Sequence, residues 1–182
     1  MAPEAPLEST GTGLNRTGDG WFVLNGREGR WYHAEGRGAR TDFEGDVEFE
    51  QVGVHLFALE PGEPMGMYHW EADQEDFLVV NGEALLIVDG EERPLRRWDF
   101  VHCPPGTGHA IVGAGSGPCV IVAVGAREHQ DAPGWGGYPV DDAARRHGAG
   151  VEAETTEAGE AYASVPGRQP TAHREGWLPD PD

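Results

Sequence analysis

The sequence contains no lysine. All 13 of its basic residues are arginine, they stand against 32 aspartates and glutamates, and the formal net charge is −19. Nucleic-acid binding depends on Lys and Arg to neutralise phosphates, and anionic membrane surfaces attract the same residues. This excess of negative charge argues against a nucleic-acid or membrane partner. It is typical of a protein whose net charge keeps it in solution.

Cysteines and long apolar runs are also scarce. The two cysteines, Cys103 and Cys119, are too few for a disulfide framework, and because both lie among strand-forming residues we expect buried free thiols. No window approaches the ~18 continuous apolar residues that a membrane-spanning helix needs. The first 20 residues lack the apolar core of a secretory signal. We therefore expect a cytoplasmic protein.

Glycine and proline, by contrast, are abundant, with 28 and 14 residues. They interrupt short apolar runs, as at the turn signals Asn81-Gly82 and Asp89-Gly90, and they form no repeat. Residues 46–125 show strand-like runs of even length and no helical period. This pattern indicates an antiparallel β-barrel or sandwich.

The chain length fits one domain with extensions. Residues 1–20 are predicted to form a flexible N-terminal tail, because they are rich in small residues and have little to bury. Residues 21–127 are predicted to form a β-barrel with N-terminal strands. Residues 128–182 are predicted to add a C-terminal extension, with a short helix capped by Asp141 or Asp142 and then a proline-rich extended arm.

Several predicted strands are apolar on both faces, for example "FLVV" and "CVIVAV". Their outer faces need cover, either from the ends of the chain or from a second subunit. Trp177 and Leu178 in the arm are expected to dock on the body of the protein or on a partner. We expect a homodimer.

Polar residues with metal-ligand chemistry surround the stretch "MYHWEADQEDF". His69 and Glu71 alternate on one strand and so share a face. A hairpin folded about "ADQ" would bring Glu75 beside them, and His109 begins another strand after the turn "PPGTG". Two imidazoles and two carboxylates that converge inside a barrel suit a divalent first-row metal.

At these residues the chain resembles the cupins. The first cupin motif runs His-x-His, three or four residues, Glu, six residues, Gly. Here it reads His69, Glu71 in place of the second histidine, Glu75 and Gly82.

The second cupin motif, Pro-x-Gly-x-x-His, is matched by Pro104, Gly106 and His109. The resemblance covers residues 46–127. It implies an all-β cupin double-stranded β-helix, a jelly-roll barrel, followed here by the short C-terminal helix and the arm. It also implies a bound divalent transition metal. A carboxylate-rich shell favours iron or manganese, and zinc and nickel are possible.

Glu71 leaves two arrangements open. If Glu71 joins His69, Glu75 and His109 as a ligand, a divalent ion in the shell is neutral overall. If Glu71 stays off the metal, the other three form a two-histidine, one-carboxylate set with open positions, and Glu71 is free to act as a general base.

Met67, Phe77 and Ile111 share strand parity with the predicted ligands. They are expected either to line an apolar substrate pocket around the metal or simply to fill a narrow barrel. Because there is no lysine and the arginines fall mostly in turns, we expect no sugar-phosphate or nucleotide site. Five other histidines lack partners at ligand spacing and are expected to be surface or packing residues: His33, His55, His129, His147 and His173.

We therefore expect a metal-binding cupin that acts on a small oxygenated molecule, with dioxygenase-like chemistry in which the metal chelates the substrate. Two alternatives stay open, a non-catalytic small-molecule binder or sensor, and a cupin isomerase or lyase.

Overall fold

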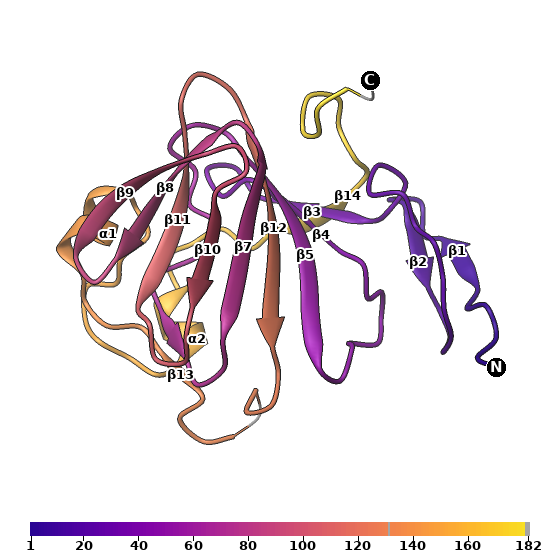
Figure 1. The fold of residues 1–182 in the computed structure, drawn as a ribbon, viewed down its shortest axis with the longest axis horizontal. Helices are drawn as coiled ribbons and strands as arrows, with labels where there is room; N and C mark the ends of the chain where they lie inside the picture. Colours follow the sequence, from indigo (N-terminus) through magenta and orange to yellow (C-terminus); the bar gives the residue numbers. More distant parts are fainter. Residues whose placement is uncertain (131, 181–182) are drawn as a thin grey trace.

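The computed structural model describes residues 1–130 and 132–180 (Figure 1). The strands are β1 Leu7–Ser9, β2 Leu14–Arg16, β3 Trp31–His33, β4 Ala39–Asp42, β5 Val52–Leu59, β6 Trp70–Glu71, β7 Glu75–Asn81, β8 Glu83–Val88, β9 Glu91–Arg96, β10 Phe100–Cys103, β11 His109–Ala114, β12 Cys119–Ala126, β13 Gly136–Gly137 and β14 Gln169–Thr171. Two short helices, α1 Asp142–Arg146 and α2 Ala158–Ala161, lie in the C-terminal part.

Two antiparallel sheets face each other and form the barrel (Figure 1). The larger has the order β10-β7-β12-β5-β4-β3-β14, and the smaller has the order β11-β8-β9. Alternate residues point inward, as Phe77 and Val79 do on β7 and Ile111 does on β11, and they meet in one buried cluster between the sheets. The all-β, double-stranded β-helix prediction is confirmed.

One local prediction is wrong. The segment before "ADQ" does not form a hairpin with β7, because β6 pairs with β13 through Trp70 opposite Gly137 and Glu71 opposite Gly136. β7 instead lies between β10 and β12 in the larger sheet. The "ADQ" connection therefore crosses from one side of the barrel to the other. The alternation of side chains along a strand cannot tell such a crossing from a hairpin.

The C-terminal extension covers the outer face of the smaller sheet. Asp141 caps α1 by accepting a hydrogen bond from the backbone N–H of Ala144 at 2.8 Å. Ala143 and Ala144 of this helix pack against Ile87 of β8 and Val112 of β11 in a second buried cluster. The cap prediction is confirmed, and these strands have both faces buried within one chain.

The proline-rich arm joins the larger sheet. β14 pairs antiparallel with β3, and Trp177 and Leu178 then pack against Trp31 in a third apolar cluster. The rings of Trp177 and Trp31 lie with their centroids 5.1 Å apart. The prediction that Trp177 and Leu178 dock on the body is confirmed, while the homodimer stays a prediction. Asp131 and residues 181–182 of the predicted extension lie outside the described residues.

Residues 1–20, which were predicted to form a flexible tail, contain the two strands β1 and β2. β1 and β2 pair as a hairpin, which lies at the opposite end of the molecule from α1 (Figure 1). The buried guanidinium of Arg16 anchors it, donating hydrogen bonds to the carbonyls of Glu44 at 3.0 Å and Gly18 at 2.9 Å. A buried cation held by carbonyl groups fixes this segment, so the apolar pattern could not reveal it.

Cys103 and Cys119 are both free and buried, as predicted. Burial raises the pKa of Cys103 to about 12 and that of Cys119 to about 11, so neither is a reactive thiolate near neutral pH. Within the described ranges, no helix has the length and apolar character to cross a bilayer.

The arm makes a testable contribution to stability. Trp177→Ala removes an aromatic side chain that packs on Trp31 and His33, so we expect the free energy of unfolding to fall by about 2 to 3 kcal/mol in urea denaturation. The control Trp98→Ala, at a residue that is 63% exposed, should cost about 1 kcal/mol or less. Equal losses for the two variants would show that the arm does not stabilise the barrel.

Candidate metal centre and its pocket

The two sheets deliver the predicted ligands from opposite sides. His69 and His109 form an antiparallel bridge, in which the N–H of each residue donates to the carbonyl of the other at 3.1 and 2.9 Å. Glu75, the first residue of β7, shares the inward face with Phe77 and reaches the histidines from the larger sheet. The side chains of all three residues therefore converge inside the barrel.

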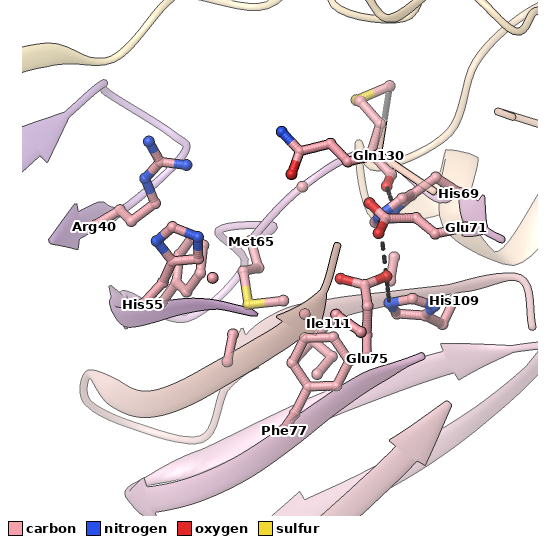
Figure 2. A pocket seen from close by; sticks show the side chains of 18 of the residues that line it. Arg40, His55, Met65, His69, Glu71, Glu75, Phe77, His109, Ile111 and Gln130 are labelled. Atoms are coloured by element: carbon pink, nitrogen blue, oxygen red, sulfur yellow. Dashed lines mark hydrogen bonds and ion pairs between the residues drawn. The ribbon is translucent and has the colours of Figure 1, made fainter. Parts of the chain in front are cut away.

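The ligand atoms lie at short and similar separations (Figure 2). Glu75 Oε2 is 3.4 Å from His69 Nε2 and 3.3 Å from His109 Nε2. The ligand atoms of these three residues all lie within 4.8 Å of one another. Atoms bound about 2.0–2.2 Å from a shared ion stand roughly 3–3.5 Å apart, so the spacing fits a mononuclear centre.

Hydrogen bonding fixes which imidazole nitrogens face the centre. His69 Nδ1 lies 2.8 Å from the carbonyl of Met67, and His109 Nδ1 lies 3.0 Å from the carbonyl of Thr107. Each carbonyl can only accept, so each Nδ1 carries the proton and donates it. The Nε2 atoms of both rings are therefore the ones that face the carboxylate of Glu75.

Two buried atoms at this point have no hydrogen-bond partner among the described residues, Glu75 Oε2 and His109 Nε2. Both offer lone pairs, and they lie 3.3 Å apart. Leaving buried polar atoms unpaired costs free energy, and two facing acceptors repel each other unless a cation or proton lies between them. The donor set, two imidazoles and a carboxylate, fits a divalent transition metal.

Burial and neighbouring charges shift the pKa values of all three groups. Burial acts to lower the pKa of His69, but Glu71 and Glu75 outweigh it and hold that pKa well above its usual value. Burial acts to raise the pKa of Glu75, yet His69 and His109 lower it. For His109, burial and the neighbouring His69 lower the pKa, which favours the neutral, ligating form.

Glu71 stands beside the three-residue group. Its Oε1 is 3.5 Å from His69 Nε2, and Figure 2 shows its carboxylate on the same side of the centre as His69. Burial raises the pKa of Glu71 and the charge of Glu75 raises it further, while its hydrogen bond with His69 opposes both. Glu71 is thus a partly buried carboxylate with a strengthened affinity for protons.

A cavity of about 370 Å³ opens from the centre, a size within the range of small-molecule sites. Met67, Phe77 and Ile111 all line it, and each is less than 5% exposed. The structure therefore favours the pocket interpretation of these three residues over simple barrel filling.

The expectation that the arginines lie mostly in turns, away from the pocket, is wrong. Arg40, Arg127 and Arg168 line the same cavity, together with His55. The alternation of side chains along a strand could have predicted that His55 points into the pocket, because it precedes the inward-facing Phe57 by two residues on β5. The pairing of β4 with β5 could have predicted the same for Arg40, because Arg40 lies opposite Phe57. No sequence signal marks Arg168, because it comes from the arm and reaches the pocket only through the tertiary fold.

Residues 55–125 match the family model described as the cupin domain. Fold and site together define an antiparallel β-barrel with a candidate mononuclear metal centre between its sheets. Over this segment the resemblance to the cupins is therefore confirmed.

Several solved structures are similar over part of the chain. They include a proposed sugar phosphate isomerase from Acidithiobacillus ferrooxidans (27% identity, 53% of this chain and 66% of that one, TM-score 0.46). A sugar phosphate isomerase of the cupin superfamily from Silicibacter pomeroyi shows 29% identity over 58% and 67% of the two chains, with a TM-score of 0.44. A cupin 2 conserved barrel domain protein from Salinispora arenicola shows 22% identity over 53% and 82%, with a TM-score of 0.46.

The chain thus spans just under two thirds of the Acidithiobacillus protein. No protein of curated function matches the sequence.

The cationic end of the pocket predicts an unusual histidine. Burial, followed by the charges of Arg40 and Arg127, lowers the pKa of His55 to about 4. Because this value lies below the unfolded value of 6.5, protonation favours the unfolded chain. His55 should therefore reduce the free energy of unfolding as pH falls from about 6.5 toward about 4.

Arg40→Gln should raise the pKa of His55, measured by NMR titration of its imidazole, because one nearby positive charge is removed. Arg93→Gln, at an exposed arginine paired with Glu91 at 3.2 Å, serves as the control and should leave that pKa unchanged. An unaltered His55 titration in Arg40→Gln would contradict the close approach of the two side chains.

Proposed function

We propose that the protein is a metal-dependent cupin in which His69, Glu75 and His109 hold one divalent transition metal, with iron or manganese favoured over zinc or nickel. The metal would act on a small oxygenated molecule that chelates it. One observation carries the proposal: Glu75 Oε2 and His109 Nε2 face each other 3.3 Å apart, buried and unpartnered within the described part of the chain.

Two histidines and one carboxylate leave open coordination positions, the arrangement used by many non-haem iron oxygenases. When bound, such an ion supplies Lewis-acid and one-electron redox chemistry. The surrounding residues contribute the rest. Met67, Phe77 and Ile111 form an apolar wall of the pocket, and apolar walls strengthen electrostatic interactions with a bound ligand. This supports a dioxygenase-like role.

Glu71 has the placement of a proton-transfer group in this site. It lies next to the centre without belonging to the three-residue ligand group, and burial together with the charge of Glu75 raises its pKa, which strengthens its affinity for a proton. The same observation favours a second candidate function, an isomerase or lyase reaction in which Glu71 removes a proton from a chelated substrate. A non-catalytic binding or sensing role is the alternative that the experiments below would reveal.

Elemental analysis of freshly purified protein should find about one transition-metal ion per chain. Glu75→Gln and His109→Ala should each lose most of it, because each variant removes one of the three ligands. His102→Ala, whose imidazole is exposed and pairs with Asp76 at 2.6 Å, is the matched control and should retain the metal. Full occupancy in His109→Ala would remove that residue from the shell.

Glu71→Gln should retain the metal yet reduce turnover by about 10²- to 10⁴-fold on a substrate found by screening small oxygenated molecules for oxygen uptake or for isomerisation. Metal analysis and turnover must be measured on the same preparation. Loss of the ion in Glu71→Gln would make Glu71 a ligand instead. Metal-loaded protein that binds a ligand tightly and never converts it would favour the sensing alternative.

A further inference from the structure

We propose that the end of the pocket away from the metal centre is an oxyanion site, in which Arg40 and Arg168, beside His55, bind a carboxylate or phosphate group of the ligand. This inference rests on the proposed function in one respect, which is that the opposite end of the same ligand would face the metal. It narrows the substrate class from a small oxygenated molecule to one that also carries a negatively charged group.

The placement comes from three separate elements. Arg40 lies on β4 opposite the inward-facing Phe57, and His55 lies on β5 two residues before it. Arg168 comes from the arm, with its guanidinium carbon 5.7 Å from the centroid of the Phe57 ring. Figure 2 shows Arg40 and His55 together at one end of the pocket and the histidine–carboxylate centre at the other.

Backbone carbonyls hold the guanidinium of Arg168 in place, but they do not neutralise its charge. Its guanidinium donates to the carbonyls of Met65 at 2.9 Å, Gly38 at 3.4 Å and Arg37. No carboxylate among the described residues forms an ion pair with it. Burial, followed by the charge of Arg40, lowers the pKa of Arg168 to about 10, so it remains a cation at neutral pH.

Arg40 is similarly underpaired. Its closest ion-pair contact within the described part of the chain is a marginal one, Nη2 to Asp42 Oδ2 at 4.0 Å, and its buried Nε has no hydrogen-bond partner there. Arg127 in the same cavity is fully paired by comparison, because its Nη1 lies 2.9 Å from Glu44 Oε2 and 2.8 Å from the carbonyl of Phe49. Arg40 and Arg168 have no such partner.

His55 adds a polar group without adding charge. Its Nδ1 is buried and unpartnered by any described residue, and with a pKa of about 4 the ring is neutral at physiological pH. Gly53 leaves room for it, since a Cβ there would lie 3.2 Å from His55 Nε2 and 2.6 Å from Arg127 Nη2. A neutral imidazole can donate one hydrogen bond to an oxyanion.

The charge balance points to an anionic occupant. Glu71 and Glu75 would neutralise a divalent ion at one end, and Glu44 neutralises Arg127. At the other end Arg168 has no ion pair among the described residues, and Arg40 has only the marginal contact with Asp42 at 4.0 Å. Keeping such cations in a partly buried cavity without a close counterion costs free energy. A carboxylate or phosphate offsets that cost, and the planar guanidinium fork matches its oxygens.

Two matched pairs of probes test the proposal on manganese-loaded, full-length protein by calorimetry. 2-Hydroxyglutarate is compared with 2-hydroxypentanoate, and 3-phosphoglycerate is compared with glycerate. Within each pair the chelating 2-hydroxy acid is the same, and only one member carries a second anionic group. We expect the doubly anionic member of at least one pair to bind about tenfold or more tightly than its partner. The pair that shows the preference identifies carboxylate or phosphate as the recognised group.

Arg40→Gln should reduce that preference to about twofold or less while leaving the affinity for the singly charged probe nearly unchanged. Arg93→Gln should behave as the unaltered protein does. Metal content is measured in every variant, so that loss of the ion, which would defeat the proposed function, is separated from loss of anion recognition. Equal binding within both pairs, or a preference that survives Arg40→Gln in metal-loaded protein, would overturn the oxyanion site.

Discussion

The structure depends above all on one constraint, which is that the two facing sheets bring three lone-pair donors to a single point. The backbone bridge between His69 and His109 fixes the two imidazoles side by side, and carbonyls of Met67 and Thr107 hold their Nδ1 protons. Glu75 approaches from the other sheet. Glu75 Oε2 and His109 Nε2 face each other there as acceptors without a hydrogen-bond partner among the described residues, an arrangement that the proposed cation would stabilise.

The pocket acquires its character from two ends of opposite sign. One end gathers carboxylates and imidazoles, and the other gathers arginines whose charges are only partly compensated. Between them lie the apolar side chains of Met67, Phe77 and Ile111. A ligand that spans such a cavity is fixed in direction as well as position, because reversing it would place like charges together.

The C-terminal extension is part of this arrangement as well as a cover for the barrel. Its helix α1 buries the outer face of the smaller sheet, and its arm extends the larger sheet through β14. The same arm carries Arg168 into the pocket and seats Trp177 on Trp31. Segments that look peripheral in the sequence therefore contribute both stability and charge to the site.

The sequence by itself determined the class of fold and the candidate ligand residues. Short strand-like runs and glycine turns indicated the barrel, because they depend on local geometry, and the two short motifs that resemble those of the cupins marked His69, Glu75 and His109. Tertiary structure alone decided which sheet carries each candidate ligand residue, how the N-terminal hairpin is anchored on Arg16, and which arginines line the pocket. These features arise from contacts between segments distant in sequence, where a buried cation held by carbonyl groups leaves no periodic trace.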